Sequence, residues 1–119
     1  MPRQGRIILP KTPHHIMRRG HNRDTVFNGD DDFEYHKTNR IEFKEKTECK
    51  IYAYCLMTNH VQIIIDPGKD PAALSQFMKG VAGRQTRYIN KTAKPSGSLW
   101  EGRFKSSIIS THEYLLSRF

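Results

Sequence analysis

The chain has 119 residues, of which 36% are hydrophobic and 27% are charged, so it is predicted to form one soluble domain with a modest core. No apolar run approaches the roughly 18 residues of a membrane span, and the first residues lack a secretory signal pattern. Two cysteines, Cys49 and Cys55, would lie about 20 Å apart on one strand, too far to bridge. A cytoplasmic protein without membrane attachment is expected.

The formal net charge of +8 is the strongest compositional feature. Basic residues gather near aromatic ones, a combination that favours nucleic-acid binding over a merely solvated basic face. From charge and position, the candidate phosphate contacts are Arg18, Arg19, Arg23, Arg84, Arg87, Arg103 and Lys105.

Strand and helix signals alternate along the chain. We expect strands at residues 12–19, 49–57, 60–66 and 103–109, and helices at residues 31–46 and 70–90. This order predicts an α+β, ferredoxin-like split βαβ sandwich, a four-stranded antiparallel sheet with both helices on one face. A third helix opens near residue 110 and the chain ends within its pattern. We therefore expect residues 1–119 to be one domain, C-terminally incomplete, with this third helix truncated.

Residues 51–66, IYAYCLMTNHVQIIID, predict a hairpin turning at Thr58 and Asn59, where Asn59 tolerates the left-handed conformation. His60 and Gln62 stand two apart on the second strand and therefore share a face. Such a pair can hold a divalent metal ion, although spacing alone favours a hydrogen-bonded polar pair at the hairpin end.

The other histidines and aromatic residues give weaker signals. His14 and His15 are adjacent, so only one of them can face a given site, and His21, His36 and His112 are predicted to lie on the surface. Tyr52 and Tyr54 are expected on one face of their strand, as core or stacking residues. Trp100 either stacks on a base or fills the junction between loop and sheet. Zinc, nucleotide-loop and serine-hydrolase motifs are missing from the sequence.

Three segments, HHIMRRGHNRDTVF, AYCLMTNHVQIII and GSLWEGRFKSSIISTHEYLL, resemble in order and spacing the single-tyrosine HUH transposases, especially the branch associated with bacterial repetitive extragenic palindromes. This resemblance implies that a tyrosine attacks a backbone phosphate at the foot of a DNA hairpin. It also implies Mg²⁺ or Mn²⁺ held by His60 and Gln62. The family pattern has a second histidine where this chain has Gln62, and an amide oxygen suits these hard ions.

The family's nucleophile is expected just beyond Phe119. Tyr114 lies on the corresponding helix about two turns early and is the candidate within the chain, whereas Tyr88 does not match the motif. The resemblance thus implies a metal-assisted single-strand endonuclease and strand transferase acting on hairpin or single-stranded DNA. Whether the chain itself is an enzyme stays open at this point.

Two other functions stay open. One is a catalytically inactive or domesticated relative that binds hairpin DNA without cutting it, and the other is a ferredoxin-like RNA-binding module. Relatives include dimers that exchange the tyrosine helix, so a homodimer is also an option.

Overall fold

The computed structural model of the protein describes residues 7–21, 25–92 and 99–109. The elements follow the chain as β1 (His14–Arg19), α1 (Asp30–Thr47), β2 (Lys50–Met57), β3 (His60–Asp66), α2 (Ala72–Thr92) and β4 (Lys105–Ile108). Each of these helices and strands begins and ends within two residues of the position that the sequence predicts. The predicted third helix lies outside the described residues.

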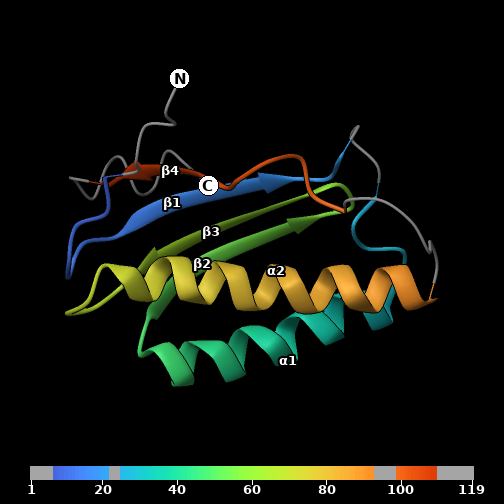
Figure 1. Cartoon of the computed structure of the whole chain (residues 1–119), viewed down its shortest axis with the longest axis horizontal. Helices are drawn as coiled ribbons and strands as arrows, with labels where there is room; N and C mark the ends of the chain where they lie inside the picture. The colour runs from blue at the N-terminus through green and yellow to red at the C-terminus, as the bar shows by residue number, and fades with distance from the viewer. Residues whose placement is uncertain (1–6, 22–24, 93–98, 110–119) are drawn as a thin grey trace.

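The four strands form one sheet in the order β2-β3-β1-β4, and every neighbouring pair is antiparallel. The helices α1 and α2 lie side by side on the same face of this sheet (Figure 1). The predicted α+β sandwich with both helices on one face is therefore confirmed. Strands β3 and β1 are central, and β2 and β4 form the edges.

The core lies between the helices and the central strands. Alternate residues of β1 and β3, among them Ile16, Val61 and Ile63, are almost completely buried, because residues two apart on a strand share a face. Leu74 and Phe77 of α2 are fully buried against the same cluster. The residues between them in β1 and β3 therefore project from the opposite side of the sheet, which we call the distal face.

Helix α1 packs through polar residues, which differs from the sequence prediction. Its buried residues are Asp32, His36, Asn39 and Arg40, whereas Ile41 is 50% exposed. The prediction of a surface His36 is therefore wrong. Partners from distant segments explain this burial: the Phe27 ring meets the His36 ring edge-on, and the Arg40 guanidinium lies 4.0 Å from the centre of the Tyr54 ring.

One local prediction is corrected by the backbone. Within the described residues, only Lys11 and Glu48 among the non-glycine residues have positive φ, so Asn59 does not use the left-handed conformation. The N-cap of α1 is Gly29, without a side-chain cap. Asp32 instead accepts a hydrogen bond of 2.6 Å from the Asn28 backbone N–H. In the described part of the chain, neither helix is long and apolar enough to cross a membrane.

Candidate metal and DNA site

The hairpin turn that precedes His60 is fixed by backbone hydrogen bonds from a distant segment. The Thr58 carbonyl accepts from the N–H groups of Val26 (2.7 Å) and Phe27 (3.2 Å), and the Asn59 carbonyl accepts from Gly20 N–H (2.8 Å). These contacts hold the turn without the left-handed conformation at Asn59 that the sequence suggested. They anchor the start of β3, so His60 projects from a well-supported backbone.

Side-chain contacts hold His60 in one orientation. Its Nδ1 lies 2.9 Å from the Asn59 side-chain oxygen Oδ1. Because an amide oxygen only accepts hydrogen bonds, Nδ1 carries the ring proton and Nε2 carries the lone pair. A second partner of this kind is what fixes the tautomer of a metal-binding histidine. The His60 Nε2 lies 3.3 Å from Gln62 Nε2, so it accepts from the amide here.

The structure brings a third side chain to this pair that the sequence did not single out. His15 Nε2 lies 3.0 Å from Gln62 Oε1, so one amide stands between two imidazoles. The pairing register explains the contact: Met17 is opposite Gln62 and His15 is opposite Ile64, which puts His15 one step diagonally from Gln62 on the distal face. The adjacent His14 is fully buried on the other side, so only one of the two histidines faces the site, as the sequence predicted.

The donor set fits a divalent metal ion. Imidazole nitrogen and amide oxygen are neutral ligands that Mn²⁺ accepts, and the amide oxygen also suits Mg²⁺. Among the residues that the structure describes, no three His, Cys, Asp or Glu side chains gather closely enough to form a metal site. A site here therefore depends on the Gln62 amide, with remaining positions left for solvent or substrate.

Basic side chains gather beside the β4 edge of the sheet on its helix side. A groove of about 460 Å³ is lined by Arg18, Lys79 and Arg103 together with Trp100 and hydroxyl side chains of α2. Burial lowers the pKa of the Arg18 guanidinium, which still stays charged at neutral pH. Arg18 donates to the Gly102 carbonyl from Nη2 at 2.8 Å and from Nε at 3.2 Å. The groove thus presents three cations and no lining carboxylate.

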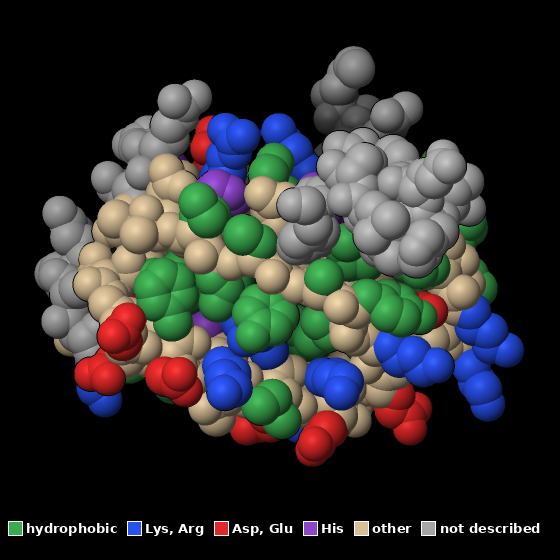
Figure 2. All heavy atoms as spheres, turned by 180° about the vertical axis from the view of Figure 1, so that it is seen from behind, with side chains coloured by type: hydrophobic (Ala, Val, Ile, Leu, Met, Phe, Trp, Pro, Cys, Tyr) green, Lys and Arg blue, Asp and Glu red, His purple; other side chains and the backbone are tan. Residues whose placement is uncertain are grey.

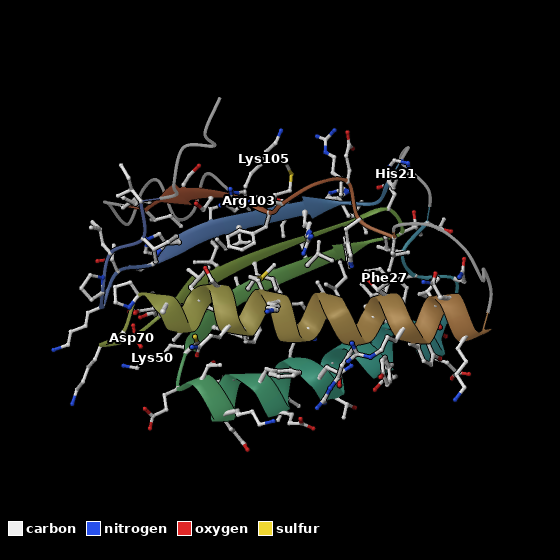
Figure 3. All side chains as sticks on the ribbon, viewed as in Figure 1. His21, Phe27, Lys50, Asp70, Arg103 and Lys105 are labelled. Carbon is white, nitrogen blue, oxygen red and sulfur yellow. The ribbon has the colours of Figure 1, made fainter. Side chains whose placement is uncertain are left out.

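A second basic cluster lies nearer the His60 pair. In the pairing register Arg19 is opposite His60, and Lys105 of β4 is opposite Met17, so both project from the distal face. Arg103 and Lys105 follow each other along the β4 edge (Figure 3). A hollow of about 140 Å³ joins both clusters, and Glu101 also lines it.

The comparisons with known proteins decide the family. The family model described as "Transposase IS200 like" matches residues 10–117, almost the whole chain. The chain belongs to the IS200-like transposase family. A comparison with curated proteins finds no match.

Two solved structures are similar to this IS200-like transposase. One is a REP-associated tyrosine transposase bound to a REP hairpin, with a TM-score of 0.79 and 14% identity, covering 99% of this chain and 68% of that one. The other is a Deinococcus radiodurans protein assigned to the transposases, with a TM-score of 0.65 and 18% identity, covering 98% of this chain and 93% of that one. At these identities the likeness supports the fold.

Two further predicted site residues, Arg84 and Arg87, lie on α2 apart from the His60 pair. Arg84 on α2 forms an ion pair of 2.6 Å with Glu42 of α1 and donates to Asn39 Oδ1 at 3.1 Å, so it joins the two helices. Arg87 is exposed on α2. Arg23 and Tyr114 lie outside the described residues.

Of the aromatic residues left open by the sequence, Trp100 fills the junction between loop and helix. It is only 7% exposed, and its Nε1 donates to the Ala82 carbonyl at 3.2 Å. Tyr52 and Tyr54 are about half exposed and line a groove between α1 and the edge strand β2. Figure 2 shows exposed hydrophobic side chains on the back of the molecule, bordered by Lys and Arg. The register of β2 against β3 shifts between Ile51 and Ala53, and both tyrosines still line this one groove, as expected of residues on the same face.

Proposed function

We propose that this transposase cuts and rejoins single-stranded DNA beside a hairpin, by attack of a tyrosine on a backbone phosphate. The observation that carries the proposal is the His60–Gln62 pair on the distal face, with Arg19 opposite His60 in the adjacent strand. A metal-ligand pair next to a cation is an arrangement suited to a phosphate that gains negative charge during the reaction.

The residues have distinct roles in this proposal. His60 Nε2 and Gln62 Oε1 would hold Mg²⁺ or Mn²⁺, which polarises the scissile phosphate when bound. Asn59 keeps the His60 lone pair directed to the site through its 2.9 Å contact with Nδ1. Arg19 and Lys105 bind the DNA backbone on the distal face, and Arg18 and Arg103 bind it in the groove beside α2.

The tyrosine is proposed from the family resemblance. Its hydroxyl oxygen loses its proton and attacks phosphorus, a 5′-phosphotyrosyl bond forms, the P–O3′ bond breaks, and the 3′ oxygen of the leaving strand takes up a proton to become a hydroxyl. Because the bond energy is retained in the covalent link, the reverse attack rejoins DNA without an external energy source. Tyr114 or a tyrosine encoded after Phe119 is the candidate nucleophile.

One observation favours a second function, a relative that binds hairpin DNA without cutting it. The Gln62 amide is already engaged at both ends, with Oε1 at 3.0 Å from His15 and Nε2 at 3.3 Å from His60. A hydrogen-bonded network of this kind is stable without a metal ion.

The two functions are separated by one experiment on protein made from the complete reading frame. A 5′-labelled and a 3′-labelled hairpin oligonucleotide with single-stranded flanks are incubated with Mn²⁺ and analysed on denaturing gels and in gel shifts. The proposal predicts a protein–DNA adduct that survives denaturation and is lost in His60→Ala, with His21→Ala as an exposed histidine control. Binding that persists in EDTA without any adduct selects the second function. Loss of the adduct in Tyr114→Phe would identify Tyr114 as the nucleophile.

A further inference from the structure

We propose that His15 is a third ligand of the divalent ion, so that the site consists of two imidazoles and one amide. The proposal rests on the metal site of the proposed function and adds a residue from β1 that the sequence motif does not contain. It implies that β1 supplies the second imidazole in a chain whose β3 motif has Gln62 in that position.

The placement of the three side chains supports this assignment. The register of β1 and β3 puts His60, Gln62 and His15 in one row on the distal face, with Gln62 in the middle. The Nε2 atoms of both histidines lie within hydrogen-bonding distance of the same amide group. All three side chains are half-buried, which limits solvation but leaves the site accessible.

The distance between His15 Nε2 and Gln62 Oε1 matches the distance between two ligands of one ion. Ligands at about 2.1 Å from an octahedral ion and at right angles to each other are about 3.0 Å apart. The His15 Nε2 to Gln62 Oε1 distance is 3.0 Å, and the Gln62 amide nitrogen is 3.3 Å from His60 Nε2. A partial rotation of the amide about its terminal torsion, which is soft, would turn Oε1 toward the space between the two imidazoles.

Binding of the ion by His15 requires only a change of the imidazole tautomer and no additional reactant. In the structure the amide oxygen accepts from His15, so His15 carries its proton on Nε2. Ligation through Nε2 requires the neutral tautomer with the proton on Nδ1, an exchange that water mediates. The amide hydrogen bond to His60 Nε2 is replaced by the bond from that lone pair to the ion.

The ligand set has a consequence for metal preference. With one imidazole the site would be mainly oxygen-coordinated by amide and water, which suits Mg²⁺. A second nitrogen ligand shifts affinity toward Mn²⁺ and Co²⁺, because imidazole favours transition metals. We therefore expect Mn²⁺ to bind more tightly than Mg²⁺.

The alternative is that His15 only orients Gln62 by donating a hydrogen bond to it. Both roles weaken metal binding when His15 is removed, so affinity alone does not separate them. The number of nitrogen atoms bonded to the ion does, because an orienting residue contributes none.

The test is pulsed electron paramagnetic resonance of Mn²⁺ bound to the full chain, which detects ¹⁴N couplings of directly bound imidazoles. We expect two imidazole couplings in the wild type, one in His15→Ala, one in His60→Ala and two in Gln62→Ala. The exposed His21→Ala variant should keep both. Titration calorimetry should show that His15→Ala weakens Mn²⁺ binding by about tenfold or more.

One coupling in the wild type, unchanged in His15→Ala, would overturn the inference. The wild-type spectrum alone decides the question if His15→Ala does not fold. Failure of the proposed function has a different signature: two couplings without any cleavage of hairpin DNA leave the metal site in place and reject the nuclease. Cleavage with one coupling rejects only the role of His15.

Discussion

Gly80 of α2 lies directly against the Phe43 ring of α1, and replacing it with alanine should destabilise the protein. A Cβ atom at Gly80 would lie 2.6 Å from Cζ and 2.7 Å from Cδ1 of Phe43 on α1. Carbon atoms in favourable contact are about 3.5–4.0 Å apart, so the ring has to move. Arg84 lies over this ring at 4.6 Å from its centre and moves with it.

The expected magnitude follows from two opposing effects. Overpacking of this kind costs about 1–3 kcal/mol, whereas alanine in place of a helical glycine gains about 1 kcal/mol. We therefore expect Gly80→Ala to lower the free energy of unfolding by about 1 kcal/mol, from a mid-range overpacking cost of about 2 kcal/mol.

Gly83 on the same helix is a matched control. An added Cβ there meets only Arg87 Nη1, at 3.5 Å, which is ordinary contact. Gly83→Ala should therefore raise the free energy of unfolding by about 0.5–1 kcal/mol. Urea unfolding followed by circular dichroism at 222 nm measures both variants. The account of helix packing is refuted if Gly80→Ala is as stabilising as Gly83→Ala, or if the difference between the two persists unchanged in a Phe43→Ala background.

Two further predictions concern pH and salt. Burial, followed by the charge of Arg40, lowers the pKa of His36 to about 3, so the unfolded chain binds a proton below pH 6.5 that the native protein excludes. Stability should therefore fall as pH drops below 6.5, by about 2 kcal/mol at pH 5 from this group, and urea midpoints that do not change between pH 7 and pH 5 would contradict this. In hairpin DNA titrations at several salt concentrations, Lys79→Ala and Arg103→Ala should each weaken binding and lower the salt slope by about 1. Lys50→Ala, at the other end of the sheet (Figure 3), should change neither, and equal effects of all three would reject the groove as the DNA contact.

The sequence predicts the fold because its elements carry local signals. Residues 60–66 form an Ile- and Val-rich run that is typical of a buried strand. In α2, apolar residues such as Leu74 and Phe77 recur with the period of a helix. Helix α1 has no such stripe. Its burial depends on His36 and Arg40 meeting Phe27 and Tyr54, and no spacing within residues 31–46 encodes those partners.

The candidate site also combines residues that a local sequence pattern identifies with a residue that only a long-range contact brings in. His60 and Gln62 are two residues apart on one strand, so the sequence brings them together by itself. His15 is 47 positions from Gln62 in the chain, and only the β1–β3 register joins them. If the predicted first strand had been paired antiparallel to the strand at 60–66 in the observed register, His15 would have been placed on the same face as Gln62. The sequence does not fix that register.

The central claim is that a metal ion at the His60–Gln62 site contacts the phosphate that is cut. Once the cut position is known from product lengths, a single phosphorothioate at that linkage tests this contact directly. The account predicts that this substrate is cut slowly with Mg²⁺ and that Mn²⁺ restores the rate, because sulfur binds Mg²⁺ poorly and Mn²⁺ better. His60→Ala should remove the Mn²⁺ rescue. Equal cleavage with Mg²⁺ and Mn²⁺, or undiminished cleavage in EDTA, would contradict the account.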